Sequence, residues 1–596
     1  MERNRVENEH TSSSYPTLNT LVRLQPIYDI AEICAQQGIN EAVLCPGSRC
    51  APLTSAFVAH PKINTRTFND ERSAAFIANG IALAKQLPVV LVCTSGSAAF
   101  NFAPAIAEAF YQHIPIVVLT ADRPKEWVDQ LDGQTIRQGN IYGSHVKKFY
   151  ELPQDYEHTD TRWYINRCVN EAINLSYQFP RGPVHINIPL REPLYPAHGE
   201  TIQFSPDVRI IESLERTTQL QLDGLDKLRS TFYATNKVLI VAGQQSHDSI
   251  FAIALDSFSK QHHLPIVADV ISNLHSLSHG VTHADAMLEQ CKPDNKKALQ
   301  PELLITFGKS VISKNLKIFL RNYKPAIHWH IQPEGEVADT FQSLTAVLPA
   351  TPLSFLQQFS QVVPKSGFDG QKRENYYRLW EAEEHRTQRA TKAFFSTPQL
   401  NEFSLVNEII KNSPQPSHLH LSNSMPVRYA NFIGLGDKQK ETAVFANRGT
   451  SGIDGCTSTA VGHSLACDTP TILITGDMAF FYDRNAFWHN YKLPNLRIVV
   501  LNNHGGAIFG MIDGPNQLPE FDEYFITHQR LSARSVALEY DFDYLKLDSL
   551  KKLKNLMKDF FDFDGRTKII EIESTATNTR IILDNFKKQI RSNYET

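Results

Sequence analysis

TILITGD (471–477) and LRIVVLNNHGG (496–506) are the two stretches that decide the predicted fold of this chain. Each is an apolar, largely β-branched run that ends in small or polar residues, which is typical of a buried strand with a polar tip. In an open parallel sheet the carboxyl ends of neighbouring strands share one crevice. We therefore expect the carboxylate of Asp477 and the carboxamides of Asn502 and Asn503 to meet over a ligand.

The polar tips of these two strands suit a divalent cation. Carboxylate, carboxamide and backbone carbonyl oxygens are ligands that Mg²⁺ takes, and the ion usually keeps water or substrate phosphate in its remaining positions. Alone, Asp477 would be interpreted as a helix N-cap and Asn502-Asn503 as a turn. The Gly-Asp pair is followed by 24 residues and then by Asn-Asn. That spacing resembles the metal and diphosphate motif of thiamine diphosphate enzymes.

Length and composition limit the possible functions. The 596 residues are too many for one core and predict about three or four domains. The net charge of −4 offers no bulk field for nucleic acid or an anionic membrane. Eight cysteines without a CxxC pair are typical of a cytoplasmic protein with reduced thiols. Because residues 1–20 are polar and no apolar run approaches 18 residues, we expect neither a secretion signal nor a membrane span.

Alternation of apolar runs with helix-like segments predicts an α/β chain built from three doubly wound parallel-sheet domains. We expect a pyrimidine-binding domain at 1–205, a central domain at 206–370 and a diphosphate- and metal-binding domain at 371–596. The strand-like runs outside the last domain are EAVLCPGSR (41–49), PVVLVCTSG (88–96), IPIVVLTADRP (114–124), GPVHINIP (182–189), NKVLIVAG (236–243), LPIVADV (264–270), PELLITFGKS (301–310) and AIHWHI (326–331).

Several other classes of site lack their usual motifs. The sequence contains no Walker A motif, no GxSxG motif and no complete dinucleotide fingerprint. Histidines alternate at His328 and His330, and again at His418 and His420. With no HExxH motif and no nearby cysteine, we interpret these four as packing or surface residues rather than zinc ligands.

Glu71, in FNDERSAAF (68–76), stands at the expected start of a helix. An acidic residue there is favoured by the helix dipole, and that alone is worth a few tenths of a kcal/mol. A buried glutamate whose pKa is shifted can also relay a proton during catalysis. The metal motif 400 residues downstream favours the catalytic interpretation.

Seven motifs make the resemblance to known enzymes specific. Together they resemble the 2-succinyl-5-enolpyruvyl-6-hydroxy-3-cyclohexene-1-carboxylate synthase family of menaquinone biosynthesis, with a match that is thin in the middle third. Thiamine enzymes in general share the metal motif and the glutamate, but not TADRP with GQTIRQ or the pattern NRGxSGIDG. The seven are PGSR (46–49), DER (70–72), TSGSAAFN (94–101), LTADRP (119–124), GQTIRQ (133–138), NRGTSGIDG (447–455) and GDMAFFYDRNAF (476–487).

This resemblance implies a cofactor site. Thiamine diphosphate would be anchored by Mg²⁺, or by Mn²⁺ in its place, held by Asp477, Asn503 and the carbonyl of Gly505. Glu71 would contact N1′ of the aminopyrimidine, so that the 4′-imino group can take the proton from C2. Ser424 and Ile453 would also contact the cofactor. In this superfamily the pyrimidine-binding domain of one chain faces the diphosphate-binding domain of another, which implies a homodimer or a dimer of dimers.

The resemblance also implies the reaction. A menaquinone-pathway carboligase of this family, a transferase, decarboxylates 2-oxoglutarate and adds the resulting enamine to isochorismate. Both substrates are dicarboxylates, and arginine binds carboxylate in a bidentate manner, although surface ion pairs are commoner for arginine. By motif match the substrate contacts are Ser48, Arg49, Arg123, Gln134, Lys314, Arg428 and Arg448, with Ile508 and Phe509 as pocket walls. The chain departs from some members at Asn315, His504 and Ala507, which affects the fine substrate contacts.

Two alternatives remain at this point. Another thiamine diphosphate-dependent 2-oxo acid carboligase or decarboxylase would share the cofactor site, but a substrate poor in carboxylates would leave the arginines without an obvious role. A catalytically inactive relative could act as a scaffold. The presence of Glu71, Asp477 and Asn503 argues against that second alternative.

Overall fold

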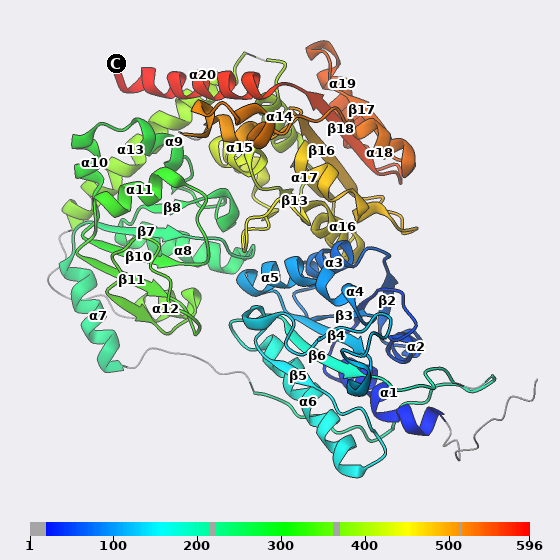
Figure 1. Ribbon diagram of the computed structural model, residues 1–596. Helices are drawn as coiled ribbons and strands as arrows, with labels where there is room; N and C mark the ends of the chain where they lie inside the picture. Colours follow the sequence, from blue (N-terminus) through cyan, green and yellow to red (C-terminus); the bar gives the residue numbers. More distant parts are fainter. Residues whose placement is uncertain are drawn as a thin grey trace, which may run out of the picture.

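The computed structural model describes residues 20–196, 198–214, 222–360, 370–397, 399–511 and 514–595, so most of the polar N-terminal stretch lies outside it. Within these ranges the chain forms three sheets of six strands each. All strand pairs in the three sheets are parallel. Figure 1 shows them as three α/β bodies, blue to cyan, green, and yellow to red. The predicted fold class is confirmed.

The N-terminal sheet has the strand order β2-β1-β3-β4-β6-β5. The chain winds outward from β1 to β2 and then returns across β1 to β3, as a doubly wound sheet does. Its strands are β1 (Glu41–Leu44), β2 (Asn64–Thr67), β3 (Val89–Cys93), β4 (Ile116–Asp122), β5 (Phe149–Glu151) and β6 (Val184–Pro189). Its helices are α1 (Thr20–Gln36), α2 (Ala51–Ala59), α3 (Glu71–Lys85), α4 (Ser97–Asn101), α5 (Ala103–Gln112) and α6 (Thr159–Tyr177).

The central sheet has the order β12-β11-β10-β7-β8-β9. Its two middle strands, β10 and β7, are buried along their whole length, as expected for a parallel sheet covered on both faces. The strands are β7 (Val238–Ala242), β8 (Ile266–Ala268), β9 (Gly280–Val281), β10 (Leu303–Phe307), β11 (Ile327–Ile331) and β12 (Ala346–Leu348). The helices are α7 (Leu222–Ala234), α8 (Ser249–His262), α9 (Ala284–Gln290), α10 (Pro293–Leu299), α11 (Lys314–Asn322) and α12 (Pro352–Ser360).

The C-terminal sheet has the order β14-β13-β15-β16-β18-β17, and its winding direction reverses between β13 and β15. Its strands are β13 (Ser417–Leu421), β14 (Thr442–Phe445), β15 (Thr471–Gly476), β16 (Leu496–Asn502), β17 (Asp543–Lys546) and β18 (Lys568–Glu573). Its helices are α13 (Gly370–Phe394), α14 (Glu402–Asn412), α15 (Met425–Ile433), α16 (Cys456–Ala466), α17 (Asp477–Tyr482), α18 (Ala533–Glu539), α19 (Leu550–Phe560) and α20 (Ala576–Glu595).

The N-terminal and C-terminal domains meet where α3 packs against α16. A Cβ atom added at Gly80 would lie 2.0 Å from the carbonyl oxygen of Thr459, and one at Gly462 would lie 2.0 Å from that of Ile77. Only glycine allows the two helix backbones to approach so closely. Helix α3, which begins with Glu71, is therefore fixed against the domain that carries Asp477.

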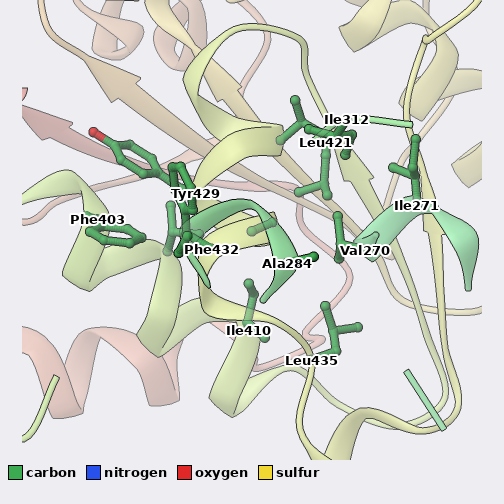
Figure 2. Close-up of a cluster of buried hydrophobic side chains, with 14 of the residues drawn as sticks. Val270, Ile271, Ala284, Ile312, Phe403, Ile410, Leu421, Tyr429, Phe432 and Leu435 are labelled. Atoms are coloured by element: carbon green, nitrogen blue, oxygen red, sulfur yellow. The ribbon is translucent and has the colours of Figure 1, made fainter. Parts of the chain in front are cut away.

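The central and C-terminal domains share one apolar core (Figure 2). Val270, Ile271, Ala284 and Ile312 from the central domain pack with residues of α14, β13 and α15 and of the turn after α15. The C-terminal contributors labelled there are Phe403, Ile410, Leu421, Tyr429, Phe432 and Leu435. Helix α15 packs on this core through its apolar side chains. This packing fixes the position of the polar residues on the same helix.

The sheets themselves span 41–189, 238–348 and 417–573. The domain limits at 205 and 370 fall between these spans and stay predictions. No helix within the described ranges combines the length and apolar character needed to cross a membrane.

Candidate active site

A cavity of about 300 Å³ opens at the carboxyl ends of β13, β15 and β16. Ligands of open α/β sheets bind at this edge, beside the point where the winding direction reverses. The cavity is lined by residues between Asn423 and Thr527, all from the C-terminal domain. Asp477, Asn503 and Gly505 are among them, so the structure brings the three predicted metal ligands to one cavity.

Asp477 is the first residue of α17 and directly follows β15. Its side chain is buried, and its Oδ2 accepts a 2.7 Å hydrogen bond from Nε2 of Gln529. Burial raises the pKa of Asp477 to about 6, although bonds from Gln529 and from neighbouring backbone amides oppose the shift. A bound cation would favour the ionised form and reverse that effect of burial.

The two adjacent asparagines have different roles. Asn502 is occupied within the fold, because its Nδ2 donates to Oε1 of Glu571 at 2.8 Å and its Oδ1 accepts from Gln529 at 3.0 Å. Asn503 is also buried, but its Oδ1 has no hydrogen-bond partner among the described residues. A buried acceptor without a donor is costly unless a ligand satisfies it. This atom therefore fits a cation in the cavity.

Gly505 allows close backbone packing next to the cavity. A Cβ atom at this position would lie 2.5 Å from the carbonyl oxygen of Ile526. His504 precedes it with a φ of +61°, in the left-handed region. The turn after β16 therefore depends on glycine for its path around the site.

Ser424 and Arg428 occupy the start of α15, on the cavity wall. Ser424 has a φ of +73°, and its carbonyl oxygen accepts a 2.6 Å hydrogen bond from Nη1 of Arg428. Burial, and then the charge of Arg448, lower the pKa of Arg428. The guanidinium of Arg428 is thus held at the cavity with little solvent and a second arginine nearby.

Arg448 contacts a residue of the cavity wall, because its Nη1 donates a 2.8 Å hydrogen bond to Oδ1 of Asn423. Arg448 also affects Lys317, on α11 of the central domain. The pKa of Lys317 is lowered first by burial and then by the positive charge of Arg448. Lys314, predicted as a substrate contact, is exposed one turn earlier and does not line the cavity. Asn315 is used locally, since its Nδ2 donates to the carbonyl of Asp285 at 3.0 Å.

Apolar residues form the rest of the cavity wall. Ile453, Ile508 and Phe509 all line it, as predicted for a cofactor support and pocket walls. Ala507 lines it as well. The mixture of apolar walls and few polar groups is typical of a small-molecule site.

Arg49 and Arg123 form a second basic pair, in the N-terminal domain. Burial and then the charge of Arg123 lower the pKa of Arg49, so the two guanidiniums lie near each other. Arg49 donates to the carbonyl of Leu190 at 2.9 Å, and Arg123 donates to that of Gly133 at 3.1 Å. Ser48 and Gln134 are exposed nearby in sequence. None of these four lines the cavity of the C-terminal domain in this chain.

Glu71 begins α3, immediately after the capping residue Asp70. It is half-buried, and burial raises its pKa. The flanking residues contact the C-terminal domain: Oδ2 of Asp70 accepts from Asn485 at 2.7 Å, and Arg72 donates to the carbonyl of Tyr482 at 2.8 Å. Glu71 itself is not among the residues that line the cavity.

Sequence reasoning missed Gln529, which contacts this site, and Lys317, which lies near Arg448. Gln529 joins Asp477 to Asn502, yet it sits 52 residues after Asp477 in a stretch without a motif. Lys317 lies three residues after the predicted Lys314, one helical turn away, so helix periodicity could have suggested it.

Curated relatives match this chain over nearly its whole length. The protein from Cytophaga hutchinsonii is 43% identical over 572 residues, which is 96% of this chain and 100% of the relative. The protein from Flavobacterium psychrophilum is 39% identical over 563 residues, 94% of this chain and 98% of the relative. Both are named 2-succinyl-5-enolpyruvyl-6-hydroxy-3-cyclohexene-1-carboxylate synthase.

The chain belongs to this synthase family. The predicted family and the predicted enzyme class, a transferase, are therefore confirmed. The thiamine pyrophosphate enzyme descriptions also match in order: the N-terminal TPP binding domain at residues 28–145, the middle domain at 213–421 and the C-terminal TPP binding domain at 435–572. Thiamine diphosphate is thus the cofactor of this synthase family member.

A solved structure agrees with the fold. Benzoylformate decarboxylase from Polynucleobacter necessarius superposes with a TM-score of 0.68, covering 92% of this chain and 98% of the other. At 15% identity this likeness concerns the fold alone. The synthase family assignment rests on the closer relatives.

Proposed function

We propose that this chain catalyses the thiamine diphosphate-dependent decarboxylation of 2-oxoglutarate and joins the remaining four-carbon unit to isochorismate. The products are 2-succinyl-5-enolpyruvyl-6-hydroxy-3-cyclohexene-1-carboxylate and CO₂. Full-length relatives named for this product support the proposal. Arg428 on the cavity wall and Arg448 beside that wall, both half-buried, suit dicarboxylate substrates and support it further.

The metal site is the part of the proposal that one observation supports best. The unpartnered Oδ1 of Asn503 lines the same cavity as Asp477 and Gly505. Mg²⁺, or Mn²⁺ in its place, would bind that oxygen together with the Asp477 carboxylate and the Gly505 carbonyl. When bound there, thiamine diphosphate supplies the electron sink that decarboxylation of a 2-oxo acid needs.

The roles of the chain's own residues follow from their surroundings. Glu71, whose pKa is raised by burial, holds and releases a proton at N1′ of the aminopyrimidine. Arg428 and Arg448 orient substrate carboxylates at one side of the site, with Ser424 beside them. Ile453, Ile508 and Phe509 keep water from the reacting atoms. Ser48, Arg49, Arg123, Gln134 and Lys314 complete the proposed substrate contacts.

The working unit that we propose is a homodimer, alone or as a dimer of dimers, with each site shared between chains. Support comes from the cavity, which is lined only by the C-terminal domain although catalysis also needs Glu71. A second chain would bring Glu71 and the pair of Arg49 and Arg123 to this cavity. We also propose a cytoplasmic location, which the eight free cysteines support.

The reaction can be tested directly. The protein is incubated with thiamine diphosphate, Mg²⁺ and 2-oxoglutarate, with and without isochorismate, and products are identified by mass spectrometry. We expect 2-succinyl-5-enolpyruvyl-6-hydroxy-3-cyclohexene-1-carboxylate only when both substrates are present, and none from Asp477→Ala. Decarboxylation with no adduct would instead identify a 2-oxo acid decarboxylase. Absence of any turnover by cofactor-bound protein would favour the scaffold alternative.

A further inference from the structure

A cluster of imidazole and thiol groups lies at the opposite edge of the C-terminal sheet from the cavity. His418 is the second residue of β13, while His463 lies in the last turn of α16 and Cys467 follows that helix. Strand β13 runs from His418 to its end at Leu421, a span of roughly 10 Å, and Asn423 on the cavity wall lies two residues further along the chain. The cluster is therefore separate from the proposed magnesium site.

The three side chains converge on one point. Nδ1 of His418 lies 2.9 Å from Nε2 of His463 and 3.5 Å from Sγ of Cys467, and all three ligand atoms lie within 4.8 Å of one another. Around a tetrahedral Zn²⁺, nitrogen ligands at about 2.0 Å and sulfur at about 2.3 Å stand roughly 3.3–3.6 Å apart. The two distances from His418 differ from these values by at most a few tenths of an ångström, and the third pair of ligand atoms lies within 4.8 Å.

Local structure holds the donors in place. His463 and Cys467 are four residues apart, which puts them on one side of the helix end. Nδ2 of Asn495 donates to the carbonyls of Cys467 and Thr469 at 2.8 and 3.0 Å, fixing the loop after α16.

A third imidazole lies beside the cluster, outside the group of three converging ligand atoms. His420 lies on the same face of β13 as His418, and its ring centroid is 4.8 Å from that of His463. Its Nε2 is buried and has no hydrogen-bond partner in the described part of the chain. The interpretation of His418 and His420 as packing residues assumed that no cysteine was near. Cys467 is far in sequence but adjacent in space.

We propose that His418, His463 and Cys467 form a second metal site, for Zn²⁺ or a similarly soft divalent ion, that fastens the start of β13 to the end of α16. Mixed imidazole and thiolate donors select zinc over the oxygen-preferring magnesium of the cavity. Because α16 packs against α3, the ion would also support the junction between the N-terminal and C-terminal domains. We expect a structural effect, since the site lies away from the cavity.

Metal counting tests this site. The full-length protein is stripped with chelator, saturated with thiamine diphosphate and Mg²⁺, exposed to Zn²⁺ and desalted, and zinc is measured by mass spectrometry. We expect about one zinc per chain in the wild type and in Asp477→Ala. Cys467→Ser, and separately His463→Gln, should lose it, whereas Cys168→Ser, which removes a thiol in the N-terminal domain, should keep it. Zinc should raise the melting temperature only of variants that retain the cluster.

Cobalt gives a readout that does not depend on stability. With Co²⁺ in place of Zn²⁺, the wild type should show a thiolate-to-cobalt charge-transfer band, and Cys467→Ser, at a half-exposed position that tolerates the change, should not. If the wild type retains no zinc and shows no such band, the cluster is only a hydrogen-bonded aromatic packing group with Phe445. Undiminished zinc in Cys467→Ser would equally overturn the proposal.

Discussion

Gln529 and Asp477 are joined by a 2.7 Å hydrogen bond in which Nε2 of the amide donates to Oδ2 of the carboxylate. The same amide nitrogen also donates to Oδ1 of Asn502 at 3.0 Å. Asn502 is fixed in strand β16, and Gln529 joins it to Asp477. Gln529 therefore orients the carboxylate of Asp477, the proposed metal ligand. It is a positioning residue for the site.

Gln529→Ala should weaken metal binding without abolishing it. Loss of a hydrogen-bond partner behind a metal ligand typically costs about 10–100-fold in affinity. Manganese titration of cofactor binding, followed by calorimetry, would measure the change, and saturating metal should restore most turnover. Gln517→Ala, at an exposed position, is the matched control. If both variants bind the metal with equal affinity, Gln529 does not position the metal ligand.

The pKa of Asp477, near 6, predicts how pH acts on the protein without metal. An acid whose pKa is raised on folding stabilises the fold below its unfolded pKa, and this stabilisation is lost as the pH rises from about 4 to about 6. Metal binding requires the ionised carboxylate, so affinity should fall below about pH 6. Urea unfolding of metal-free protein should show the pH dependence, and Asp477→Asn should flatten it. If Asp477→Asn keeps the same pH dependence of the free energy of unfolding, another titrating group is responsible for it.

Glu71→Gln should leave cofactor binding largely intact but slow the loss of the C2 proton. An amide cannot exchange a proton with N1′ as a carboxyl group does, and such losses cost about 10²–10⁴-fold. Deuterium exchange at C2 of bound thiamine diphosphate measures this step directly. Glu157→Gln, an exposed acid of the same domain, serves as control. If Glu71→Gln exchanged the C2 proton at the wild-type rate, Glu71 would have no role in proton transfer and would act only as a charge at the start of α3.

Arg428→Lys and Arg123→Lys should separate substrate binding from cofactor binding. Each keeps a positive charge but loses the planar fork that pairs with a carboxylate. Loss of a charge-assisted hydrogen bond predicts an increase in KM of about 10-fold or more for one dicarboxylate, with cofactor affinity unchanged. Steady-state kinetics with each substrate varied would measure it, and Arg534→Lys, which is exposed, provides the comparison. If the kinetics with both substrates are unaltered in one variant, that arginine does not bind substrate and has a structural role.

The parts of the molecule that followed from sequence are those set by local patterns. Buried aliphatic runs such as Val89–Cys93 and Thr471–Gly476 predicted the parallel sheets, and the Gly-Asp and Asn-Asn spacing predicted the shared edge of Asp477 and Asn503. Gln529 and Cys467 could not be found in that way. Each acts through a contact with a residue about 50 positions away, and no local pattern encodes such a contact.

The distribution of site residues within one chain leads to the last prediction. The cavity beside Asp477 is lined only by the C-terminal domain, while Glu71 begins a helix of the N-terminal domain. If each site joins the N-terminal domain of one chain to the C-terminal domain of its partner, a symmetric dimer contains two equivalent sites. A dimer of one Glu71→Gln chain and one Asp477→Ala chain then has one site with both changes and one with neither.

Co-expressing these two inactive variants with different affinity tags, and purifying the doubly tagged species, should recover roughly half of wild-type activity per dimer if the sites are independent. Doubly tagged dimers of two Glu71→Gln chains are the control, and they should stay inactive. A site built within one chain would carry a change in every copy, so an inactive mixed dimer would contradict the shared site. Recovery of activity would require that Glu71 and Asp477 act together from different chains, because no other pairing leaves an intact site.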